Sequence, residues 1–108
     1  QVISGDDIIT LPLLSAGCVG VISVVAQAFP KEFSGMVNEA LKGNFEKAQE
    51  LHYILFDFME LFFAEGSPSG VKAALSIRGI CENRLRLPLV PVSNELEGRI
   101  NNSLSKLK

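Results

Sequence analysis

One unbroken apolar segment stands out in the pattern of polar and apolar positions along the chain. Residues 19–25 read Val-Gly-Val-Ile-Ser-Val-Val, without alternation between the two kinds of side chain. Such a run is typical of a strand in a parallel sheet whose two faces are both covered. Residues 2–4 form a shorter β-branched segment, and a Gly-Asp-Asp turn follows at 5–7. We therefore predict a short strand, a helix over about 6–16 and a second strand over 19–25.

From Pro30 onward the apolar positions recur at helical spacing. Pro30 suits the first position of a helix, and an apolar stripe continues from there to Leu41. Gly43 and Asn44 end this helix and begin the next, which we predict over 45–64. That helix is apolar over so wide a face that it must pack against more than one neighbour. Its main stripe consists of Ala48, Leu51, Leu55, Phe58, Met59 and Phe62.

Two further helices are predicted in the C-terminal part of the chain. Over 67–79, a serine cap followed by a proline indicates a helix that ends at a glycine. Residues 85–91 read LRLPLVP and are predicted to be extended, because prolines interrupt them. The last helix begins at Ser93 or Asn94, and Asn94 and Glu97 have the spacing of a capping box. The residues alone therefore indicate two strand–helix units followed by three helices.

Composition narrows the functional classes. The 108 residues are 47% hydrophobic and 20% charged, which is sufficient for a hydrophobic core. The net charge of −2 argues against a partner that is a nucleic acid or an anionic membrane, and no apolar run approaches the roughly 18 residues of a membrane span. Cys18 and Cys81 are too few for a disulfide framework and lack CxxC spacing, so we expect a reducing cytoplasm. Apart from Arg78 near Cys81, no basic residue stands beside them to activate a thiol, so we expect both to be buried and unreactive.

Charge is distributed unevenly along the chain. Residues 1–66 contain nine acidic and three basic side chains, whereas residues 67–108 contain three acidic and seven basic ones. This asymmetry indicates either attraction between two parts of one fold, which we favour, or a basic surface for a partner.

Motifs that carry chemistry are sparse. Asp6 can cap the first helix, with Asp7 favourable near its N-terminus, although Gly5 and Asp6 could instead contact a ligand at the end of a strand. His52 is the only histidine and has Phe56 at i+4, which excludes a zinc-binding pair on this helix, and we favour a packing role for it. Neither GxxxxGK[ST] nor GxGxxG occurs. We therefore predict no metal site and no cofactor, and interpret the phenylalanine-rich helix as core or subunit interface.

Three segments occur in an order that resembles one enzyme family. They are residues 4–7 (SGDD), 20–24 (GVISV) and 85–91 (LRLPLVP). Because these segments occur together and in this order, the chain resembles the C-terminal third of enzymes of the dihydrodipicolinate synthase family, which are pyruvate-dependent Schiff-base lyases. The resemblance implies a mainly α fold with two short parallel strands. Residues 1–42 would be the last two βα units of a TIM (β/α)₈ barrel, and 43–108 the three-helix extension that follows it.

The resemblance also implies a reaction and a site. Members of this family condense pyruvate with aspartate semialdehyde in lysine biosynthesis, through a Schiff base on a lysine of the sixth strand. That lysine would precede Gln1, so we expect this chain to be a fragment with no catalytic residue and no activity of its own. Ile22 matches a position whose backbone lies against pyruvate, and Gly5 and Asp6 match the loop after the seventh strand. A cytoplasmic homo-oligomer is implied for the complete enzyme.

A different interpretation is a free-standing helical module whose phenylalanine-rich face binds a partner helix. Residues 19–25 distinguish the two, because a barrel requires a strand that is apolar on both faces and a helical module does not. We therefore favour the fragment. Two strands alone leave unpaired edges, so we also expect the isolated chain to associate into a dimer or a larger species.

Overall fold

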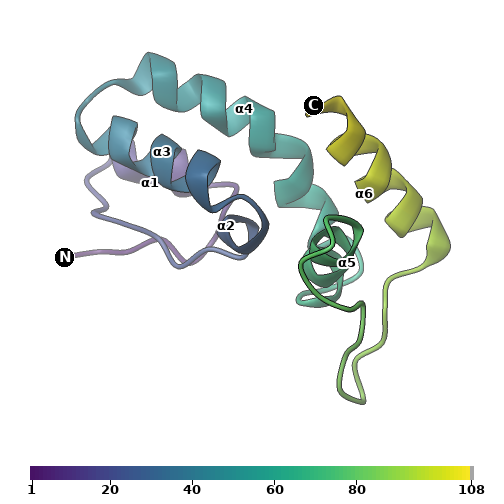
Figure 1. Ribbon diagram of the computed structural model, residues 1–108. Coiled ribbons are helices and arrows are strands. Elements are labelled where there is room, and N and C mark those ends of the chain that lie inside the picture. Colours follow the sequence, from purple (N-terminus) through teal and green to yellow (C-terminus); the bar gives the residue numbers. More distant parts are fainter. Residues whose placement is uncertain (108) are drawn as a thin grey trace. The chain divides into compact units, whose positions relative to one another are not determined.

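The computed structural model describes residues 1–107, and Figure 1 shows that their regular secondary structure is helical. The chain divides into two units, Gln1–Met59 and Glu60–Lys108, with the boundary inside the fourth helix. The predicted boundary between 42 and 43 concerns the complete enzyme and stays a prediction. The helices are α1 (Thr10–Ser15), α2 (Val25–Ala28), α3 (Pro30–Leu41), α4 (Phe45–Leu61), α5 (Ser69–Ile77) and α6 (Asn94–Lys106). Within residues 1–107, no helix combines the length and the apolar character that a membrane span needs.

The two predicted strands are reduced to a short parallel pairing in the first unit. Ser4 and Val21 form a parallel bridge, which agrees with the predicted orientation. The strand predicted over 19–25 is too long, because α2 already begins at Val25. The N–H groups that would continue a ladder bind a side chain instead, as described below. Three backbone hydrogen bonds join the segments, from Val19 N to the Val2 carbonyl (3.0 Å), from Ser4 N to the Gly20 carbonyl (2.9 Å) and from Ile22 N to the Ser4 carbonyl (2.9 Å).

The first helix is shorter than predicted. It covers Thr10–Ser15 rather than 6–16, and no side chain caps its N-terminus. Asp6 does not cap it, since Asp6 Oδ1 accepts a hydrogen bond from Ile8 N at 3.1 Å in the preceding turn. Pro12 consequently falls in the first turn of the helix, where a missing N–H costs little.

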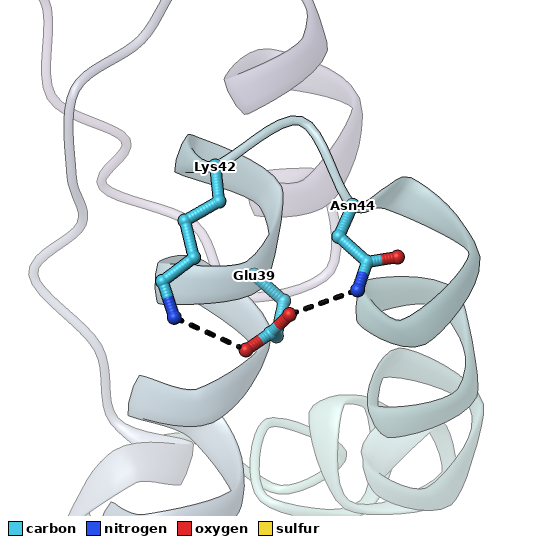
Figure 2. Close-up of polar contacts among 3 residues, drawn as sticks. All are labelled: Glu39, Lys42 and Asn44. Carbon is cyan, nitrogen blue, oxygen red and sulfur yellow. Dashed lines mark hydrogen bonds and ion pairs between the residues drawn. The ribbon is translucent and has the colours of Figure 1, made fainter.

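The helix hairpin of α3 and α4 forms as predicted. Gly43 adopts a φ of +84°, and its N–H and that of Asn44 bond to the carbonyls of Ala40 and Glu39, both at 2.9 Å. The Glu39 carboxylate also accepts from Asn44 Nδ2 at 3.0 Å and lies 3.4 Å from Lys42 Nζ, as Figure 2 shows. The Asn44 hydrogen bond and then the Lys42 contact lower the pKa of Glu39. The turn between the two helices is thus fixed by both backbone and side-chain contacts.

The core of the first unit comes from the predicted apolar stripes. The Phe29 and Phe58 rings pack with their centroids 4.6 Å apart. Leu51, placed in the α4 stripe by its spacing, is only half-buried. The buried apolar side chains of α3 and of the part of α4 within this unit are Phe33, Met36, Ala40, Ala48, Leu55, Phe58 and Met59.

The second unit is built from α5, α6 and the segments beside them. The cap predicted at Ser67 is wrong, because Pro68 occupies the N-cap position of α5 and no side chain accepts there. The next residue, Ser69, donates from Oγ to the Val90 carbonyl at 2.9 Å. Gly79, with a φ of +73°, follows the C-terminus of α5, close to the predicted end. The buried apolar side chains of this unit include Leu61, Phe62, Val71, Ala73, Ala74, Val92, Leu96 and Ile100.

Candidate functional site

Gly5 and Ile22 lie together at the carboxyl end of the parallel pairing. Because Ser4 pairs with Val21, the residue that follows each of them emerges at the same edge. Gly5 and Asp6 are exposed, and 79% of Ile22 is exposed. A Cβ on Gly5 would meet no atom within 4 Å. The three residues expected from the sequence therefore border open space.

Two buried hydroxyl groups fix the turn that contains Asp6. Ser4 Oγ and Thr10 Oγ1 both donate to the Asp6 carbonyl, at 2.9 and 2.7 Å. The two hydroxyl oxygens lie 3.0 Å apart, and Ser4 and Thr10 are 2% and 0% exposed. Neither residue could be recognised from the sequence, because hydroxyl groups six residues apart form no recognisable motif. Their effect is to hold the Gly5–Asp6 backbone in one conformation.

Asp7 has a different role from the one predicted. The residue is 2% exposed, and its Oδ2 accepts from Val24 N at 3.1 Å and from Val25 N at 2.9 Å. The carboxylate therefore caps α2 rather than α1. Asp7 Oδ1 is buried and has no hydrogen-bond partner among residues 1–107. The partners lie 17 and 18 residues away, so local spacing could not reveal the contact.

A separate groove lies between α1 and α4 in the first unit. It has a volume of about 260 Å³, and one of its lining residues is His52, which is 8% exposed. The rings of Tyr53 and Phe56 lie 5.5 and 5.6 Å from the imidazole, which is the packing role expected for this residue. Burial lowers the pKa of His52, and its Nδ1 has no hydrogen-bond partner among the described residues. The groove is lined by Leu11, Pro12, Ser15, Phe45, Gln49, His52 and Tyr53.

The thiols and acidic side chains add no further chemistry to these sites. Cys18 is free and buried as expected, but Cys81 is free and exposed, so its predicted burial is wrong. The reason is that Gly79 ends α5 and the chain then leaves the core. Within residues 1–107, no group of three His, Cys, Asp or Glu side chains is arranged to hold a metal ion.

Comparisons with known proteins agree on one family. The sequence profile described as the dihydrodipicolinate synthetase family matches residues 1–107. The chain is 49% identical to the 4-hydroxy-tetrahydrodipicolinate synthase of Phocaeicola vulgatus, over all of this chain and 36% of that protein. The chain thus spans about a third of the length of this curated relative.

Solved structures give the same result. The structure of dihydrodipicolinate synthase from Thermotoga maritima matches with a TM-score of 0.95 and 44% identity, over 99% of this chain and 36% of that one. The chloride-inhibited dihydrodipicolinate synthase of Acinetobacter baumannii, crystallised with pyruvate, matches with a TM-score of 0.94 and 31% identity, over 99% and 37% of the two chains. The helical arrangement described above is therefore one that occurs within these enzymes.

Proposed function

The chain belongs to the dihydrodipicolinate synthetase family, and we propose that it is the C-terminal third of a 4-hydroxy-tetrahydrodipicolinate synthase. The observation that carries this proposal is the 49% identity over the whole chain, combined with coverage of 36% of the relative. In the proposal, residues 1–42 are the seventh and eighth βα units of a (β/α)₈ barrel, and 43–108 are the helical extension. The parallel pairing of Ser4 with Val21 supports this placement, because a free-standing helical module would not need it.

The complete enzyme would condense pyruvate with aspartate semialdehyde through a Schiff base on a lysine. A Schiff base requires an amine at the site, activated by burial or by neighbouring groups. None of the lysines within residues 1–107 belongs to the paired segments around Ser4 and Val21. The reactive amine would therefore come from another part of the enzyme, and this chain alone would be inactive. The lysines described by the structure are Lys31, Lys42, Lys47, Lys72 and Lys106.

Gly5, Asp6 and Ile22 would form part of the wall of the pyruvate pocket. Enzymes with this barrel place their sites at the carboxyl ends of the strands, which is where these residues lie. The Ile22 contribution would come from its backbone and its shape, since the side chain carries no polar group. No metal or cofactor takes part in this proposal.

The exposed apolar side chains around the pairing support association with further protein. Val2, Ile3, Val19 and Ile22 are between 42% and 79% exposed in the chain by itself. In the complete enzyme the other strands of the barrel would cover part of this surface, because closing a barrel removes its edges. This surface supports self-association of the isolated chain, whereas the homo-oligomer that we propose for the complete enzyme rests on its family.

Steady-state kinetics of the complete enzyme test the proposal. Condensation of pyruvate with aspartate semialdehyde should require the upstream segments and should be absent from the 108-residue chain alone. Ile22→Val, which removes one methylene, should change the KM for pyruvate little, whereas Ile22→Lys should abolish pyruvate binding. Near-native kinetics for Ile22→Lys would contradict the placement of the pocket, and a complete enzyme without this condensation would contradict the function.

A further inference from the structure

We infer that Asp7 is a positioning residue for the proposed pyruvate pocket, acting on the backbone of Ile22 through the N–H groups of Val24 and Val25. The inference rests on the proposed function and extends it to a buried side chain. Asp7 would not touch the substrate. It would determine where the pocket wall lies.

The backbone at Ile22 is held from both sides by one short turn. On one side, Ile22 N donates to the Ser4 carbonyl at 2.9 Å. On the other side, Val24 N and Val25 N donate to Asp7 Oδ2 at 3.1 and 2.9 Å. Ser4 and Asp7 are the two ends of the four-residue turn 4–7, so the segment from 22 to 24 is fixed relative to Gly5 and Asp6. The backbones of the three proposed pocket residues are thereby fixed relative to one another.

The Asp7 contact acts mainly on this loop and not on a long helix. The helix that it caps, α2, has only four residues, so little helical structure depends on the cap. The loop itself is closed further by Ala26 N, which donates to Ser23 Oγ at 2.9 Å. Removal of the carboxylate would free the 22–24 segment at one end while its Ser4 end stayed attached. The expected consequence is displacement of Ile22 without loss of the fold.

The burial of the carboxylate makes the contact strong. Asp7 is 2% exposed and Val25 is 0% exposed, so water cannot easily replace the hydrogen bond if the side chain is shortened. Bonds from N–H groups to a carboxylate are about twice as strong as those to a neutral acceptor. The unpartnered Oδ1 remains available to accept from a further segment of the complete enzyme. An amide at this position would offer the two N–H groups only a neutral, weaker acceptor, and it would place an NH₂ group where Oδ1 lies.

The test compares Asp7→Ala, Asp7→Asn and the matched control Asp57→Asn in the complete enzyme. Asp57 is exposed on α4, so its substitution should leave the kinetics unchanged. For Asp7→Ala we expect the KM for pyruvate to rise about tenfold with a smaller fall in kcat, because a buried hydrogen bond to a charged group is lost. The Asp7→Asn enzyme should lie between the wild type and Asp7→Ala. Hydrogen exchange of a peptide that contains residues 22–26 should become faster in Asp7→Ala.

Each outcome decides between a positioning role and a purely structural one. A structural role would lower the amount of active enzyme and leave the KM for pyruvate unchanged, and that result would overturn the inference. Should Asp7→Ala fail to fold, Asp7→Asn alone decides, since a wild-type KM in that variant would equally overturn it. Failure of the proposed function is separate, because the wild-type enzyme would then show no pyruvate-dependent reaction.

Discussion

Glu65 and Ser93 are joined by two hydrogen bonds within the second unit. Ser93 N donates to Glu65 Oε1 at 2.9 Å, and Ser93 Oγ donates to Oε2 at 2.6 Å. The same Oγ accepts from Leu96 N at 3.2 Å and is therefore the N-cap of α6. A single carboxylate in the segment between α4 and α5 thus orients the residue that begins the last helix.

Replacing Ser93 should affect both α6 and the ionisation of Glu65. The Ser93 side chain and then its backbone N–H lower the pKa of Glu65 from its ordinary value of 4.5. Ser93→Ala should raise that pKa toward 4.5 and should cost about 1 kcal/mol of stability through loss of the cap. The pKa is measured by NMR titration of the Glu65 carboxyl carbon. Ser105→Ala, at an exposed position of the same helix, is the control, and an equal loss of stability there would contradict the capping role.

The pH dependence of stability from Glu65 has a definite sign. Because its pKa is lower in the folded chain than in the unfolded one, the contribution is complete above pH 4.5 and is lost as the pH falls through the lowered folded value. Chemical denaturation of wild type and Ser93→Ala at several pH values should therefore show two stability curves whose separation shrinks in acid to the part that comes from the lost cap. A separation between the two curves that grows below pH 4.5 would contradict the stabilising contact of the Glu65 carboxylate with Ser93.

Gly70 is required by a close approach of two backbone segments. A Cβ at Gly70 would lie 2.5 Å from the Phe62 carbonyl oxygen and 2.6 Å from Phe62 Cα. Gly70→Ala should therefore destabilise the second unit by about 1–3 kcal/mol or more, since backbone atoms have to move. Gly98→Ala is the matched control on α6, where a Cβ meets nothing within 4 Å, and it should stabilise by about 0.5–1 kcal/mol. Urea denaturation measures both, and equal effects would contradict the packing described.

The pKa of His52 reports directly on how well this side chain is buried beside the groove between α1 and α4. Burial lowers its pKa below 6.5, so protonation favours the unfolded chain, and stability should fall as the pH drops below 6.5. As the only histidine, it gives a single set of imidazole signals in an NMR titration. A midpoint at or above 6.5 would show that the ring is solvated. His52→Phe should remove this part of the pH dependence.

The helices were predictable where their periodicity was strong and the relevant contacts were local. The positions of Pro30 and Gly43 define α3 closely, because helix starts and stops depend on neighbouring residues. The strand over 19–25 was predicted too long, since a pattern of apolar residues cannot show that Val24 and Val25 donate to Asp7. Gly5 could be proposed from its place after a predicted strand and Ile22 from the family resemblance, whereas Asp7 and Thr10 act through contacts that only the folded chain brings together.

Self-association of the isolated chain follows from its exposed apolar side chains. Val2, Ile3 and Ile22 are 66%, 56% and 79% exposed beside an open parallel pairing. Exposed strand edges and apolar surface of this kind are typically covered by pairing with another chain. Light scattering at micromolar concentration should give the mass of a dimer or a larger species. A clean monomer that binds no dye for exposed apolar surface would contradict this expectation.

The most direct test of the central claim is trapping with pyruvate and borohydride, read by intact mass and by peptide mapping. The central claim is that this chain supplies pocket wall and framework to a Schiff-base enzyme whose reactive lysine lies elsewhere. The complete enzyme should gain one pyruvyl adduct on a lysine outside the 108 residues, and the chain alone should keep its mass. A stoichiometric adduct on Lys31, Lys42, Lys72 or any other lysine of this chain would contradict the account.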